Sequence, residues 1–290
     1  MTKLLRLEFR RLFKDKSFLA VSIIIVAIAL LQIVVASSSY YIDPYTHEID
    51  WFMTLKDIIS VSFQVSSTPF ILIGLFLSLF IAKDINQGTI RNKLIAGYSK
   101  VEIYVAMAIT SLVISLVGMM IYHAVIMSFI WLVPFPVDAN VAHDLENFLI
   151  YWAVGYFLIL VVTSFVTFIA MMIKNMAGAI IVSLVFLTFI VGFALLSQAL
   201  FEMLIMQQFD LYSQAQEAED ARRALNLVLD YFLPYQLLKY STSFFNPTDY
   251  TNFYSTEGTQ YLFKVLGTNI VLLAGLNVGG AFLFSKTDLK

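Results

Sequence analysis

Hydrophobic residues are gathered in long uninterrupted stretches that are separated by shorter polar segments. Six of these stretches contain no Asp, Glu, Lys or Arg, and they cover residues 18–36, 58–82, 103–133, 148–173, 175–201 and 265–284. Each is close to or above the roughly 20 residues that an α-helix needs to cross a bilayer at about 1.5 Å per residue. The pattern predicts an all-α membrane protein with six transmembrane helices.

Composition and charge support this class and predict the orientation. The chain is 60% hydrophobic with a mean hydropathy of +0.82, outside the range of soluble domains. With the N-terminus inside, the outer segments hold only five of the 18 Lys and Arg residues, namely Lys56, Arg222, Arg223, Lys239 and Lys264. Because cytoplasmic loops are enriched in Lys and Arg, we expect a multi-pass protein of the cytoplasmic membrane with both termini in the cytoplasm.

The segment before the first stretch, residues 1–17, alternates apolar and basic side chains. Wound as a helix, it gathers apolar residues on one face and basic residues elsewhere; these are Leu5, Phe9, Leu12 and Phe13, with Arg6 and Arg10 among the basic ones. Such a helix is expected to lie along the inner membrane surface, with its basic residues at anionic headgroups. The alternative is a simple basic anchor that only fixes topology.

The inner loop between the second and third stretches, residues 83–102, predicts a short separate helix. Gly88 interrupts the helix that leaves the second stretch, and Thr89 can cap a new one. Ile90 and Leu94 then share an apolar ridge, which would be exposed unless membrane or another protein covered it. A Gly-Tyr-Ser-Lys sequence from Gly97 ends the segment.

Ser99 and Glu102 form a capping-box pattern that opens the third stretch. This order of parts, with a basic N-terminal helix, six spans, the inner loop and a long outer insertion before the last span, resembles the permease subunits of ABC-2 type ABC transporters over the whole chain. In that family the loop after span two docks into a groove on the ATPase subunit. The resemblance implies an ATPase contact through Asp84, Gly88, Thr89, Ile90, Arg91, Lys93 and Leu94. An ordinary basic loop that only sets topology is the alternative.

The resemblance implies an ATP-driven exporter in which this chain pairs with a second copy or a related permease and binds two cytoplasmic ATPase subunits. Its cargo would be hydrophobic or amphipathic, such as an antimicrobial peptide, a drug or a lipid-like compound. No G-x-x-x-x-G-K-[ST] run occurs, so the chain lacks the loop that cradles ATP phosphates. We therefore expect no enzymatic activity and no cofactor on this chain, with ATP and Mg on the partner ATPase.

Two other functions stay open. A non-transporting scaffold or sensor subunit would show the same spans. An ion-coupled carrier fits less well, because such carriers place ionisable residues at membrane depth and the stretches hold only His123 beside Tyr residues. We expect His123 to be a packed residue and not a proton relay. Nothing in the sequence favours nucleic-acid binding.

The outer insertion, residues 202–264, is too long for a plain connection. Residues 213–229 are predicted to be helical, and aromatic residues suited to the headgroup level follow Pro234. In ABC-2 permeases such segments resemble short re-entrant helices that cap the translocation path. A plain outer cap and a substrate-binding surface remain equally open. The last span, 265–284, is followed by a short cytoplasmic tail, 285–290.

The remaining polar groups suggest packing, not chemistry. Two outer groups lack convincing metal-ligand spacing: His47 with Glu48, and His143 with Asp144 and Glu146. Gly275 and Gly279 form a G-x-x-x-G pattern, which we interpret as a close contact between helices of the same chain. Uncharged polar residues within spans are expected to hydrogen-bond between helices; they are Gln32, Gln198, Asn269 and Asn277.

Overall fold

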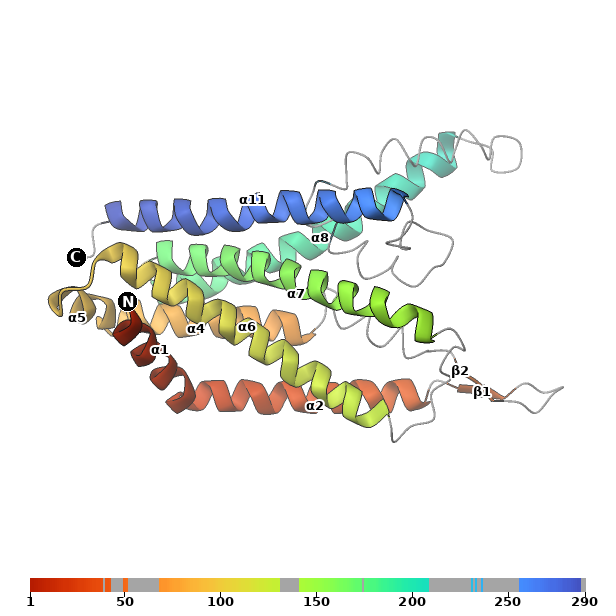
Figure 1. Ribbon diagram of the computed structural model, residues 1–290, viewed down its shortest axis with the longest axis horizontal. Coiled ribbons are helices and arrows are strands. Elements are labelled where there is room, and N and C mark those ends of the chain that lie inside the picture. The colour runs from red at the N-terminus through yellow and green to blue at the C-terminus, as the bar shows by residue number, and fades with distance from the viewer. Residues whose placement is uncertain are drawn as a thin grey trace.

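The computed structural model describes residues 1–38, 40–42, 49–51, 68–130, 141–173, 175–208, 231, 233, 236 and 256–287. Within these ranges the protein is a bundle of long helices with a short helix pair at one end (Figure 1). The helices are α1 (Thr2–Lys14), α2 (Lys16–Ser38), α4 (Thr68–Asn86), α5 (Thr89–Ile95), α6 (Lys100–Ile130), α7 (Val141–Met172), α8 (Met176–Gln208) and α11 (Thr256–Lys286).

A two-stranded antiparallel ladder departs from the predicted purely helical fold. Strands β1 (Tyr40–Ile42) and β2 (Ile49–Trp51) pair Tyr40 with Trp51 and Ile42 with Ile49. The ladder follows α2 and lies at the end of the bundle opposite α5 (Figure 1). Its three-residue strands, rich in Tyr, Ile and Trp, suit an extended backbone, but the hydropathy pattern does not separate them from the flanking loop.

Each of the six predicted stretches coincides in sequence with a long helix, but the helices begin and end at other residues than predicted. Helix α7 begins before the predicted residue 148. Helices α8 and α11 extend into the predicted outer insertion, because α8 runs to Gln208 and α11 begins at Thr256. The predicted helix at 213–229 and the first ten residues of the predicted second span lie outside the described residues.

Several of these helices could cross a membrane, judged by length and composition. Four qualify among the described residues: Lys16–Val35, Lys100–Ser128, Ala153–Met172 and Leu262–Lys286. A fifth qualifies if α4 and α5 count as one bent span, whereas the apolar part of α8, Met176–Ile190, is shorter. The protein therefore has the helical character of a membrane protein, and the full set of six spans stays a prediction.

Helices α6 and α7 form the centre of the bundle. In their spans 61% and 67% of residues are buried, against 17% for α2 and 22% for α11. Helix α6 packs against α2, α7 and α11, while α4 packs against α8, α7, α6 and α2. The exposed side chains of the rim helices are large and apolar; examples are Leu19, Leu31, Phe189, Val271 and Val278. Such an outward-facing apolar surface is what lipid tails accept.

Close contact between α6 and α11 depends on one glycine. Tyr104 of α6 donates a hydrogen bond to the Leu276 carbonyl of α11 at 3.3 Å. A Cβ at Gly280 would collide with the hydroxyl and ring of Tyr104. A Cβ at Gly275 or Gly279 would meet no atom of the described residues within 4 Å. Within the described part of the chain, Gly280 therefore makes the close contact that was expected of Gly275 and Gly279.

Of the four uncharged polar residues predicted to hydrogen-bond between helices, three form hydrogen bonds to another element of the structure. Tyr122 donates to Gln32, Asn277 Nδ2 donates to Ser164 Oγ at 3.1 Å, and Asn269 Nδ2 donates to Gln236 Oε1 at 2.6 Å. The side chain of Gln198 lies outside the described part. His123 is buried, with Nδ1 2.9 Å from Tyr156 Oη, so it is a packed residue as expected.

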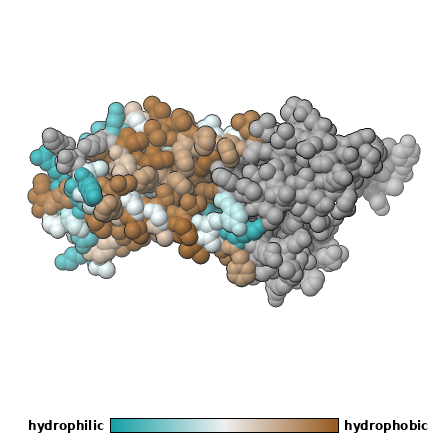
Figure 2. All heavy atoms as spheres, turned by 90° about the horizontal axis from the view of Figure 1, so that it is seen from above, coloured by the Kyte–Doolittle hydropathy of each residue, from teal (hydrophilic) through white to brown (hydrophobic). Residues whose placement is uncertain are grey.

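The start of α1 and the end of α11 lie at the same end of the bundle, beside α5 (Figure 1). Lys100 at the start of α6 donates to the Ser285 and Thr287 carbonyls at 3.1 and 2.7 Å, which ties the end of α11 to this region. Hydrophilic residues gather at this end, next to a largely apolar surface (Figure 2).

Candidate functional site

The predicted docking loop folds as a sharp turn between α4 and α5. Gly88 has φ 67° and ψ 13°, a left-handed conformation that suits glycine, and the two helices differ in direction by 57°. The predicted interruption at Gly88 is confirmed. The predicted cap at Thr89 is wrong, because Gly88 is itself the N-cap and no side chain caps α5.

The exit from α5 uses a second left-handed glycine. Gly97 has φ 90°, its N–H donates to the Leu94 carbonyl at 3.0 Å, and Tyr98 N–H donates to the Lys93 carbonyl at 3.2 Å. These two bonds form a Schellman motif. The predicted capping box then opens α6, since Ser99 N–H donates to Glu102 Oε2 at 2.9 Å and Glu102 N–H donates to Ser99 Oγ at 3.2 Å.

The faces of α5 differ from those expected. Ile90 is only 3% exposed and joins the bundle core, Leu94 is half-buried against that core, and Lys93 is buried. The apolar side chain that points outward is Ile95, which is 77% exposed. The bundle itself therefore covers the Ile90 ridge, and the exposed surface of α5 consists of Arg91, Asn92 and Ile95.

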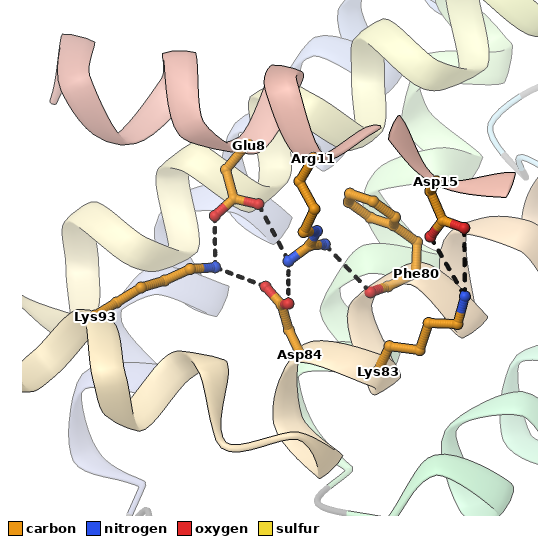
Figure 3. Close-up of polar contacts among 7 residues, drawn as sticks. All are labelled: Glu8, Arg11, Asp15, Phe80, Lys83, Asp84 and Lys93. Atoms are coloured by element: carbon orange, nitrogen blue, oxygen red, sulfur yellow. Dashed lines mark hydrogen bonds and ion pairs between the residues drawn. The ribbon is translucent and has the colours of Figure 1, made fainter. Parts of the chain in front are cut away.

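A cluster of four charged side chains holds α5 against α1 and α4 (Figure 3). Lys93 Nζ lies 2.5 Å from Glu8 Oε1 and donates to Asp84 Oδ2 at 2.6 Å. Arg11 Nη1 pairs with Asp84 Oδ1 and lies 3.4 Å from Glu8 Oε2. Acids and bases thus alternate around a closed ring, in which each charge has two partners of opposite sign. We call Glu8, Arg11, Asp84 and Lys93 the charged ring.

The charged ring is buried and electrically neutral. Exposed fractions of its side chains are 1% for Glu8, 2% for Asp84, 5% for Lys93 and 25% for Arg11. The Arg11 guanidinium also lies 3.9 Å from the centroid of the Phe80 ring and donates to the Phe80 carbonyl at 3.4 Å. Ions can leave water only when opposite charges and hydrogen bonds replace their hydration. The alternating arrangement supplies the opposite charges, whereas both Glu8 oxygens and Arg11 Nη1 have ion-pair partners but no hydrogen bond among the described residues.

Helix α1 packs against the bundle, and the residues that it buries differ from the apolar face that was expected to lie on the membrane. Leu4, Glu8 and Leu12, spaced four residues apart, are buried against the bundle. Of the predicted membrane-facing residues, Leu12 is buried, Leu5 and Phe9 are half-buried, and Phe13 is 72% exposed. The predicted basic residues Arg6 and Arg10 are exposed.

Sequence reasoning missed Glu8 and Arg11 as site residues. A signal was present, since Glu8 is the only acid in α1 and lies midway between Leu4 and Leu12 on the apolar stripe. The missing information was its partner: Lys93 is distant in sequence, and only the fold brings the two together. Of the predicted contact residues, the structure brings Asp84 and Lys93 into the ring and leaves Arg91 outside it.

A second polar group fixes the joint between α1 and α2. Asp15 accepts a hydrogen bond from Ser17 N–H at 2.8 Å, and Lys83 Nζ of α4 lies 3.3 Å from its other oxygen. Partial burial acts to raise the pKa of Asp15, but the Ser17 hydrogen bonds and the Lys83 ammonium outweigh it and hold that pKa below its ordinary value. This joint therefore stays charged and paired at neutral pH.

Among the described residues, no group of three or more His, Cys, Asp or Glu side chains could hold a metal ion. The two outer groups at 47–48 and 143–146 lie outside the part whose side chains are described. Comparison with known proteins adds no assignment: no protein-family model matches the chain, and no similar sequence was found among curated proteins.

Proposed function

We propose that this chain is the membrane-spanning permease subunit of an ATP-driven ABC exporter of the ABC-2 type. It would cross the cytoplasmic membrane six times, with both termini in the cytoplasm. A second copy or a related permease would complete the translocation path. Two cytoplasmic ATPase subunits would carry ATP and Mg and supply the energy. The cargo would be a hydrophobic or amphipathic compound, such as an antimicrobial peptide, a drug or a lipid-like molecule.

The observation that carries the proposal is the geometry of α5. A short helix turned by 57° from the end of a long apolar helix lies at the end of the bundle that also holds the start of α1 and the end of α11. Both of its ends are defined by left-handed glycines, Gly88 and Gly97. A seven-residue helix has little stability alone, so its fixed position depends on packing. It provides a rigid protrusion through which a cytoplasmic motor could push on α4 and α6.

The proposed ATPase contact is centred on Ile95 and includes Arg91 and Asn92, the exposed residues of α5. An apolar side chain that is 77% exposed beside a cation suits an apolar groove with an acidic rim. Gly88, Thr89 and Leu94 line the partly exposed flanks. Asp84, Ile90 and Lys93 would act from within, by holding α5 in position.

The decisive experiment is purification in mild detergent from the native host, followed by identification of co-purifying chains. We expect an ABC ATPase subunit to co-purify with the parent and with Ile95→Leu, which keeps an apolar tip. Ile95→Asp should lose the ATPase subunit, because a charge replaces the group that would enter the groove. Asn86→Asp, an exposed position at the end of α4, is the matched control for added charge and should retain it.

Each variant must elute and unfold like the parent, so that loss of the partner reflects loss of contact. An ATPase subunit that stays bound to Ile95→Asp would refute the contact. Recovery of no ATPase subunit with any variant would refute the exporter and favour a scaffold or sensor. Transport by the purified chain alone on a proton or sodium gradient would identify an ion-coupled carrier instead.

A further inference from the structure

Helix α5 is tied to the N-terminal helix by an ion pair in addition to its packing against α4 and α6. Lys93 reaches both Glu8 of α1 and Asp84 of α4, and Arg11 of α1 reaches the same Asp84. Two of the four charges therefore come from α1, one from α4 and one from α5. No single contact closes the ring, since each helix contributes to it through at least two pairs.

Such a ring contributes more to the choice of one arrangement than to stability. Buried ion pairs gain little over apolar packing of the same volume, but breaking one leaves an uncompensated charge out of water. A shift of α1 along its axis by one turn, about 5.4 Å, would separate Glu8 from Lys93 and Arg11 from Asp84. Each charge would keep one partner, Arg11 for Glu8 and Lys93 for Asp84, and would lose the other. The ring therefore favours one register of α1 against α5.

We propose that the charged ring locks α1 and α5 into one rigid unit, which makes Glu8 and Arg11 positioning residues for the docking helix. A displacement of α5 would then carry α1 with it. Because Asp15 and Lys83 fix the α1–α2 joint to α4, the displacement would reach the first span, α2. This last step rests on the proposed function, whereas the lock itself does not.

The lock can be measured on the purified chain without any partner. The protein contains no cysteine, so two introduced cysteines can carry spin labels without background. Arg10→Cys on α1 and Asn92→Cys on α5 are exposed positions outside the ring. In lipid nanodiscs, the parent should give one narrow distance distribution between these labels. Hydrogen exchange of the α5 amides gives a second readout that needs no label.

Glu8→Gln leaves a net positive ring and Lys93→Met leaves a net negative one. Each should broaden the label distribution and lower the protection of the α5 amides about 100-fold, from the expected energy of an unpaired buried charge. The double variant Glu8→Gln/Lys93→Met restores neutrality and should recover at least about tenfold of that protection. Lys14→Met, an exposed charge on α1 outside the ring, is the matched control and should change neither readout.

Recovery in the double variant separates an electrostatic lock from simple damage to packing, because two packing defects would add. A narrow distribution and full protection in Glu8→Gln would overturn the proposal, as would a double variant that is worse than both single ones. Should Glu8→Gln fail to fold, Arg11→Lys keeps the charge but loses the stacking on Phe80, and the proposal requires it to retain most of the protection.

The link to transport is tested separately in the complex with the ATPase subunit. Glu8→Gln should lose the stimulation of ATP hydrolysis by cargo, and the neutral double variant should regain part of it, whereas the exposed Lys14→Met should keep both basal and stimulated hydrolysis. Unchanged stimulation with a released α5 would overturn the positioning role while the exporter stands. An intact lock in a chain without any ATPase partner would refute the exporter and leave the lock in place.

Discussion

The adjacent glycines Gly279 and Gly280 should respond to alanine in opposite ways. At Gly280 a methyl group would enter space held by the ring and hydroxyl of Tyr104, and Phe168 Cδ2 would be 3.1 Å away. At Gly279 a methyl group would meet no atom of the described residues within 4 Å. The two substitutions change the same chemical group one residue apart, so any difference reports the contact between α6 and α11.

The magnitude follows from two effects. Overpacking a close helix contact costs about 1–3 kcal/mol, because side chains or backbones must move apart. Separation of the helices also weakens the Tyr104 hydrogen bond to the Leu276 carbonyl, which adds about 1 kcal/mol. Gly280→Ala should therefore lower the free energy of unfolding by about 2–4 kcal/mol. Gly279→Ala should raise it by up to about 1 kcal/mol, since alanine favours a helix over glycine.

The assay is reversible unfolding in bicelles or mixed micelles with increasing denaturing detergent, followed by circular dichroism. A double-mutant cycle with Tyr104→Ala tests the cause, because removal of the large ring makes room for the methyl group. In that background the penalty of Gly280→Ala should largely disappear. Equal stability of the two alanine variants would refute the packing argument.

Three further predictions concern the end of the bundle that holds α1 and α5. Lys93→Met should lower the free energy of unfolding by about 3–5 kcal/mol in the same assay, because it leaves two buried acids facing one base, whereas the exposed Lys14→Met should stay within about 0.5 kcal/mol. Asp15→Asn should destabilise the protein at neutral pH. Because the folded pKa of Asp15 is lowered, this difference should shrink as the pH falls through that pKa, and a gap that persists in acid would contradict the assignment. Ser99→Ala should speed hydrogen exchange in the first turn of α6, while Ser99→Thr, which keeps the capping oxygen, should not.

Local features of this fold could be predicted from the sequence. Long runs without charge located the helices, since a buried or lipid-facing helix tolerates apolar residues all round. Gly88, Gly97 and the Ser99–Glu102 pair marked the turn, the exit from α5 and the start of α6, because backbone conformation and capping depend on neighbouring residues. Ser and Glu three residues apart can bond in only a few ways, so this prediction did not need the fold.

Features set by packing could not be predicted in the same way. Ile90 and Ile95 are both apolar residues of α5, and only the packing of α5 against α4 and α6 decides which of them is buried. Gly280 and not Gly279 meets Tyr104 because of the rotation of α11, which a spacing pattern does not define. The role of Glu8 could not be predicted, since its partner Lys93 is brought to it only by the tertiary fold.

The neutrality of the charged ring has a consequence for energetics across the bilayer. A single elementary charge that moves through 100 mV of membrane potential exchanges about 2.3 kcal/mol with the field. The two acids and two bases of the ring cancel, so the ring itself adds no net charge that the voltage could act on. Any response of this end of the bundle to the voltage would then come from the exposed basic residues around the ring, such as Arg6, Arg10 and Arg91, and removal of one ring charge would add to it.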